Sequence, residues 1–295
     1  MQAANSKCTV CTDTPMGQSP FNKDKYNVGG LPVNVYSSPK SDKSEPVFIL
    51  FFLHGRLGEA ENLEVPIRAI YEKVEKELII VTFDHRNHGH RRVDDRGNHS
   101  WDEDETKSNA THAIDMYAIQ EGSARDVSFL IDYLPPYLFP ESERSISGWG
   151  LAGVSLGGHS TWTALAREPR IQVGIPIIGC PDYLLLISVR AAKFGISLDS
   201  TRYFPESLLA LIRAQAPPFT PYLHSDSSNP FYGKKILVLS GGEDPLVPWE
   251  SSRGFVEGLQ VGPEGNKKVF VQADTGHTLT PEMLSEMSEF LQSVL

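Results

Sequence analysis

The residue best placed for chemistry in this chain is Ser155, which stands at the centre of the run GVSLG, residues 153–157. An apolar segment, 147–154, precedes it, and a segment rich in Ala, Leu and Trp, 158–167, follows it. This pattern predicts a strand, a sharp turn and a helix, with glycines that let the strand and the helix approach closely. Such a turn holds the serine hydroxyl exposed at the end of a sheet. The alternative is a Gly-rich turn with an incidental serine.

A strand, turn and helix of this kind resembles the nucleophile elbow of the α/β-hydrolase family, and the resemblance covers nearly the whole chain from about residue 25. The strings DHRNHG (84–89), GVSLGGHSTW (153–162) and IGCPDY (178–183) look especially like uncharacterised fungal-type members. The resemblance implies an α/β-hydrolase fold, with a mostly parallel, doubly wound sheet, an N-terminal antiparallel hairpin and a helical cap insertion. It also implies a carboxylic ester hydrolase that works through an acyl-Ser155 intermediate.

A serine hydroxyl is a weak nucleophile until a histidine takes its proton and an acid holds that histidine in one tautomer. In the resembled family the chain order is nucleophile, acid, histidine. That order assigns the acid to Asp244, in GGEDPLVP, and the base to His277, in DTGH before the last predicted helix. Glu243, beside Asp244, and Asp182, after an earlier strand, compete for the acid role. In the structural alternative, Asp244 is a turn residue before Pro245 and His277 lies beside a helix cap.

An oxyanion forms when a serine attacks a carbonyl, and N–H donors must already be in place to meet it. The elbow offers the backbone N–H of Leu156. The segment HGRLG, 54–58, resembles the His-Gly-x loop of these enzymes, which implies the backbone N–H of Arg56 as the second donor. Gly55 gives the backbone room there and is assigned to the substrate site. The Arg56 side chain either binds a substrate carboxylate or points into solvent.

The loop from 84 to 108 holds four of the nine histidines, namely His85, His88, His90 and His99. The spacing H-x-x-H-x-H could gather two metal ligands, but no companion motif such as H-E-x-x-H supplies a third. We therefore expect loop structure here, with no metal and no cofactor. Further substrate contacts are assigned to Trp101, His112 and Tyr183.

The composition is that of an acidic chain, with 295 residues, 40% of them hydrophobic, a net charge of −10 and a pI near 5.4. Nucleic acids and anionic membranes require a basic face, so neither is expected as a partner. The chain has no run of 18 apolar residues and no apolar leader core, which predicts a cytoplasmic protein without a membrane span. Three cysteines, Cys8, Cys11 and Cys180, are too few for a disulfide framework and are expected to be reduced.

Apolar runs and turn signals divide the chain into alternating strands and helices. The runs at 47–53, 78–83 and 171–178 are continuous and predict strands buried on both faces of a parallel sheet. Alternation at 25–36 predicts the hairpin, and helical spacing at 59–77 predicts a helix between the first two buried strands. We predict a polar arm over 1–22, an α/β-hydrolase core over 23–180 and 234–295, and a cap over 181–233.

Several functions fit the same residues. The favoured one is hydrolysis of a small-molecule ester, medium-sized and partly hydrophobic because the cap is apolar. A thioesterase, or a product-releasing hydrolase of secondary metabolism, needs the same groups, and an aminopeptidase is a more distant alternative. From other classes, the chain could be a non-catalytic ligand-binding relative, or a lyase or cyclase that uses the same pocket without water attack. The sequence leaves the oligomeric state open.

Overall fold

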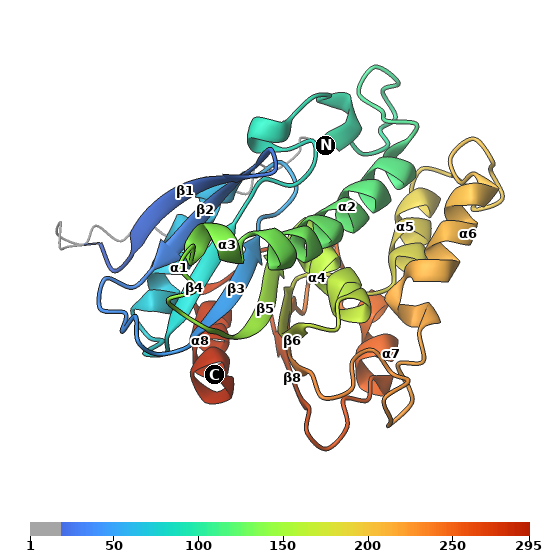
Figure 1. Cartoon of the computed structure of the whole chain (residues 1–295). Coiled ribbons are helices and arrows are strands. Elements are labelled where there is room, and N and C mark those ends of the chain that lie inside the picture. Colours follow the sequence, from blue (N-terminus) through green and yellow to red (C-terminus); the bar gives the residue numbers. More distant parts are fainter. Residues whose placement is uncertain (1–18) are drawn as a thin grey trace.

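The computed structural model describes residues 19–295, which form an α/β structure around one sheet (Figure 1). Its strands are β1 Asn22–Val28, β2 Leu31–Ser37, β3 Val47–Leu53, β4 Leu78–Thr82, β5 Ile146–Val154, β6 Ile171–Ile177, β7 Lys235–Gly241 and β8 Asn266–Gln272. They lie in the order β1-β2-β4-β3-β5-β6-β7-β8. The pairs β1–β2 and β2–β4 are antiparallel, and every other neighbouring pair is parallel. The mostly parallel sheet with an N-terminal hairpin confirms the predicted fold class.

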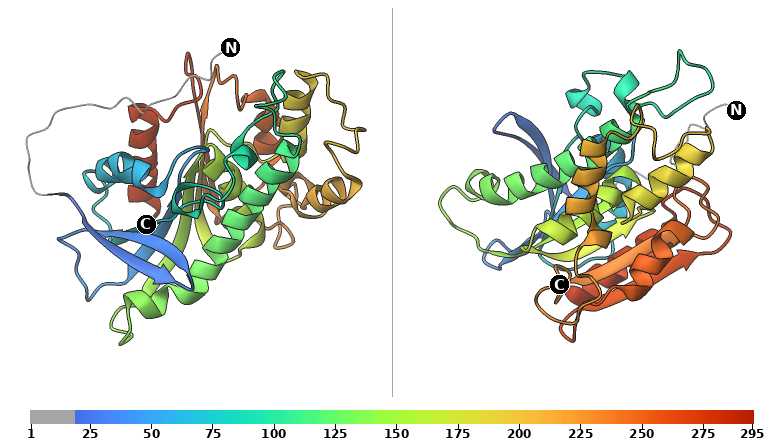
Figure 2. Two further views of the ribbon diagram at one scale, coloured as in Figure 1. Left: turned by 90° about the horizontal axis from the view of Figure 1, so that it is seen from above. Right: turned by 90° about the vertical axis from the view of Figure 1, so that its right-hand side faces the viewer.

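Helices cover both faces of this sheet (Figure 2). They are α1 Glu64–Tyr71, α2 His112–Tyr133, α3 Pro135–Leu138, α4 Leu156–Arg167, α5 Tyr183–Ala192, α6 Glu206–Gln215, α7 Glu250–Gly258 and α8 Pro281–Val294. On one face, α2, α4 and α7 bury side chains such as Leu130, Trp162 and Phe255. On the other, α1 and α8 bury Ile67 and Met287. The sheet is therefore doubly wound, as predicted.

The central strands explain why the apolar runs of the sequence were continuous. Every residue of β3 and of β4 is buried, because helices cover both faces of the strands that they form. The helix predicted over 59–77 is shorter in the structure: a 3-10 turn covers Ala60–Leu63 and α1 begins at Glu64. Pro66 accounts for the late start, since a proline has no N–H to donate and is tolerated only in the first turn of a helix.

The strand order reverses in the middle of the sheet. β3 pairs with β4 on one side and with β5 on the other, so the chain winds in opposite directions from this point. Parallel α/β sheets bind their ligands outside the carboxyl ends of the strands at such a reversal. Ser155 directly follows β5 and segment 54–58 directly follows β3, so the fold brings these two segments side by side.

Two helices, α5 and α6, are inserted between β6 and β7 and lie at the right of Figure 1. Their buried side chains, which include Ile187 and Ile212, pack with Trp101, with Tyr117 of α2 and with Leu156. This is the helical cap of the predicted fold class. The division of the chain at 180/181 and 233/234 stays a prediction.

Part of the predicted N-terminal arm, 1–18, lies outside the described residues, as do Cys8 and Cys11. Cys180 is buried and free. Within 19–295, no helix combines the length and the apolar character needed to cross a membrane.

Candidate active site

Ser155 occupies a strained turn between β5 and α4. Its backbone has φ 55° and ψ −107°, which a residue with a side chain rarely adopts. The turn is held by close packing: a Cβ added at Gly153 would lie 2.3 Å from the carbonyl of Gly157, and one added at Gly157 would lie 2.5 Å from the carbonyl oxygen of Leu53. Ser155 also donates its N–H to Ile177 over 2.8 Å. Local sequence and strand packing together fix the serine at this point.

Ser155, His277 and Asp244 form a continuous hydrogen-bonded series. The Oγ of Ser155 lies 2.7 Å from Nε2 of His277, and Nδ1 of His277 lies 2.7 Å from Oδ2 of Asp244. The other carboxylate oxygen of Asp244 accepts N–H bonds from Leu246 and Val247, each 2.9 Å long. Because the carboxylate accepts a hydrogen bond from Nδ1–H, the Nε2 atom that faces the serine carries no proton and can accept one. The Asp244 side chain is fully buried, whereas the His277 side chain is 17% exposed and accessible to a reactant.

The two competing carboxylates lie elsewhere. Asp182 is the N-cap of α5 and accepts the N–H of Leu185 over 2.9 Å. Glu243 is exposed, and no hydrogen bond joins it to His277 in the part of the chain that the structure describes. Of the three carboxylates considered from the sequence, Asp244 is the one that the structure brings to the histidine.

Two backbone N–H groups beside Ser155 are unused. Leu156 is the first residue of α4, where N–H groups have no partner within the helix and the helix dipole is positive. Among residues 19–295, no acceptor is paired with the N–H of Leu156 or with that of Arg56. A Cβ added at Gly55 would lie 3.7 Å from Cβ of Ser155, so the loop after β3 lies directly against the serine. These donors can meet negative charge that develops beside Oγ.

Most of the other histidines near this edge of the sheet are buried structural groups. The rings of His54, His85 and His88 pack together, with centroids 4.4 Å to 5.9 Å apart. Burial lowers the pKa of His54 to about 4 and lowers the pKa of His85 and of His88 as well. His85 bridges Ser123 and the carbonyl of His54 with bonds of 2.6 Å and 2.8 Å. Neutral rings that are packed together in this way hold the loop in shape.

The four histidines of the 84–108 loop do not gather as one ligand set. Within the described residues, one group of three potential ligands lies close together, formed by Glu61, Asp84 and His90. Asp84 already accepts the N–H of Ala60 and that of His90, each over 2.8 Å, so its carboxylate holds the loop together. We assign no metal to it.

The predicted substrate contacts differ in their surroundings. Trp101 and His112 are buried with their rings 5.0 Å apart, and the Nε1 and Nε2 atoms of these rings have no hydrogen-bond partner among residues 19–295. Tyr183 is buried and donates its hydroxyl to the carbonyl of Ala113, so that hydroxyl serves the packing of the cap. Sequence reasoning missed Arg190, a cap residue that donates to the carbonyl of Leu246 over 3.1 Å. No local motif marks it.

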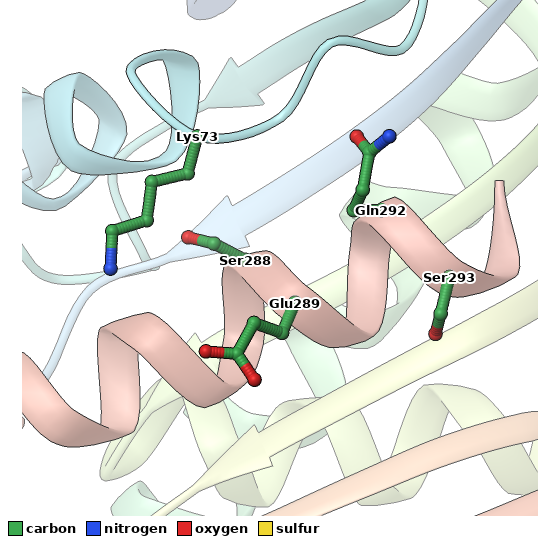
Figure 3. A pocket seen from close by; sticks show the side chains of 5 residues that line it. All are labelled: Lys73, Ser288, Glu289, Gln292 and Ser293. Carbon is green, nitrogen blue, oxygen red and sulfur yellow. The ribbon is translucent and has the colours of Figure 1, made fainter.

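Two surface hollows lie away from this site. One is lined by Lys73 and by Ser288, Glu289, Gln292 and Ser293 of α8 (Figure 3). A second is lined by residues of the hairpin turn and α2, with Arg91. Neither contains a member of the Ser155, His277 and Asp244 series.

Comparison with known proteins agrees with this description. No protein-family model matches the chain. The structure is similar to the crystal structure of TT1662 from Thermus thermophilus, with a TM-score of 0.68 and 22% identity over 92% of this chain and 97% of that one. It is also similar to Est1E from Butyrivibrio proteoclasticus, with a TM-score of 0.57 and 18% identity over 92% of this chain and 96% of that one. The chain has the α/β-hydrolase fold.

A sequence relative comes from Bacillus subtilis, where it is described as "Putative esterase YitV". It is 23% identical over 247 residues, which make up 80% of this chain and 84% of the relative. These three proteins are bacterial, so they lend no support to the fungal-type part of the predicted resemblance.

Proposed function

We propose that the protein is a serine hydrolase that cleaves a carboxylic ester through an acyl-Ser155 intermediate. The observation that carries the proposal is the hydrogen-bonded series from Ser155 through His277 to the buried Asp244, with bonds of 2.7 Å each. The description of the Bacillus subtilis relative, "Putative esterase YitV", agrees with this proposal.

The proposed reaction begins when Nε2 of His277 accepts the Ser155 proton and Oγ attacks the ester carbonyl. The negative charge on the carbonyl oxygen is met by the N–H groups of Leu156 and Arg56. The tetrahedral intermediate then collapses, and His277 returns the proton to the departing alcohol. A water molecule, activated by the same histidine, cleaves the acyl-serine bond and restores the enzyme. Asp244 holds His277 in the required tautomer and stabilises its protonated form.

The decisive experiment combines a covalent probe with turnover. We expect a fluorophosphonate to add once to the wild-type protein, as intact mass reports, and 4-nitrophenyl esters to be hydrolysed. Ser155→Ala should lose both the adduct and the turnover. Ser293→Ala, an exposed serine on α8, is the matched control and should keep both. An adduct that persists in Ser155→Ala, or a folded wild-type protein that neither reacts nor hydrolyses, would contradict the proposal.

A further inference from the structure

Two arginines beside the candidate active site have no acidic partner. The side chains of Arg56 and Arg190 are partly buried, and neither forms an ion pair within residues 19–295. Two other arginines of this region are paired: Arg91 contacts Asp126 over 2.8 Å and Arg92 contacts Asp95 over 3.2 Å. The net charge of the protein is −10, so carboxylates are plentiful elsewhere. Other arginines without an ion pair in the described chain, such as Arg68 and Arg202, are exposed, whereas Arg56 and Arg190 are partly buried beside the site.

Each of these arginines lies in, or is hydrogen-bonded to, a loop that contains part of the site. Arg56 follows Gly55, which lies against Ser155, and its Nη1 contacts the carbonyl of Asn98 at 3.4 Å. Arg190 projects from α5 of the cap, and its Nη2 donates to the carbonyl of Leu246, two residues after Asp244. One guanidinium is thus fixed on the side of the proposed oxyanion donors and the other on the side of the proposed acid.

The charges of these arginines act on each other. Burial, together with the nearby charge of Arg190, lowers the pKa of Arg56 to about 10. Burial also lowers the pKa of Arg190, while the charge of the Asp244 carboxylate acts in the opposite direction. Two positive charges that are partly removed from water repel each other, and an anion bound between them would offset this repulsion.

Buried polar atoms without partners lie in the same place. Both arginines lower the pKa of His112, so its ring lies within reach of their charges. His112 is fully buried and contacts the carbonyl of His99 through Nδ1 over 2.8 Å, which leaves Nε2 as an acceptor with no donor in the described chain. The Nε1–H of Trp101, against the His112 ring, is likewise a donor without an acceptor there. Both ring atoms are buried, so they mark polar surroundings for the two guanidinium groups, which remain the donors that a carboxylate can reach.

We propose that Arg56 and Arg190 bind a carboxylate of the substrate, so that the enzyme selects esters that also carry a free carboxylate. The inference rests on the proposed function, because it names the substrate class of that same site. A planar guanidinium presents two parallel N–H donors that match the two oxygens of a carboxylate. The carboxylate can belong to the acyl part or to the alcohol part of the ester, and matched substrates separate the two.

The test compares charged and neutral substrates of the same size. Mono-4-nitrophenyl glutarate is set against 4-nitrophenyl pentanoate for the acyl part, and 4-acetoxybenzoate against 4-acetoxytoluene for the alcohol part. We expect kcat/KM to favour the charged member of one pair by about tenfold or more. Arg190→Gln and Arg56→Gln should each lower that ratio by about tenfold, since each removes a charge-assisted hydrogen bond. Arg92→Gln, whose guanidinium is paired with Asp95, should leave the ratio unchanged.

A binding measurement keeps this inference separate from the proposed reaction. Glutaramate, the monoamide of glutarate, is titrated calorimetrically into Ser155→Ala, with and without Arg190→Gln. Binding that Arg190→Gln weakens supports the carboxylate site even if no ester is hydrolysed, in which case the proposed reaction alone is wrong. Ester turnover without preference for the charged member of either pair, together with no glutaramate binding, would overturn the carboxylate site and leave the proposed reaction standing.

Discussion

One histidine, His277, and a cluster of three others lie at the same edge of the sheet, and they differ in burial and in hydrogen-bond partners. His277 follows β8, keeps 17% of its side chain exposed, and contacts Ser155 and Asp244 through its two ring nitrogens. His54, His85 and His88 follow β3 and β4, are almost fully buried and pack against one another. The first has a reactive partner and access to solvent, whereas the second group has neither.

This contrast shows why histidine content is a poor guide to chemistry. Burial lowers the pKa values of the packed rings, so at neutral pH they are uncharged hydrogen-bonding groups. A catalytic histidine needs a carboxylate on one nitrogen and a proton donor on the other, with room for a reactant. Only the partners of each ring, which the sequence distributes over distant segments, distinguish the two roles.

The largest effect on activity is expected when the partly exposed His277 is replaced. His277→Gln should lower kcat/KM by about 10⁴- to 10⁶-fold, because the serine loses its base. The free energy of unfolding should change little, since the side chain is partly exposed. His85→Gln should show the reverse: a loss of about 1–3 kcal/mol in stability from unpaired buried groups, and less than tenfold in turnover of the folded protein. Ester kinetics and urea unfolding of both variants measure the contrast, and a His277→Gln enzyme with near wild-type turnover would contradict it.

A somewhat smaller loss of activity is expected when Asp244, the proposed acid, is replaced. Asp244→Asn should lower kcat by about 10³- to 10⁴-fold, because an amide at this point favours the wrong tautomer of His277. Glu243→Gln, one residue away and exposed, is the matched control and should stay within about twofold of wild type. If both variants lose activity equally, or if Glu243→Gln loses more, the acid has been assigned to the wrong carboxylate.

The parts of the molecule that the sequence predicts well are those set by local pattern. The turn at Ser155 is specified by five consecutive residues, and the buried strands by continuous apolar runs such as VFILFFL. The loop positions of Asp244 and His277 came from resemblance, and their 2.7 Å contact joins residues 33 positions apart. Arg190 escaped prediction because its partner, the carbonyl of Leu246, is 56 positions away and no motif links them. Long-range contacts between cap and core depend on packing that no short window of sequence contains.

The smallest effect concerns the buried rings and appears as a dependence of stability on pH. Burial lowers the pKa of His54 to about 4 in the folded protein, against about 6.5 in an unfolded chain. Between these values the unfolded state binds more protons, so the free energy of unfolding should fall as the pH drops from about 6.5 to about 4, by up to about 3 kcal/mol for this residue. Urea unfolding at several pH values measures the slope. His54→Gln should make it shallower, whereas His224→Gln, at an exposed histidine between α6 and β7, should leave it unchanged. If His54→Gln kept the full slope, the His54 ring would not be held neutral by burial. The proposed difference between His277 and the buried histidines would then be wrong for His54.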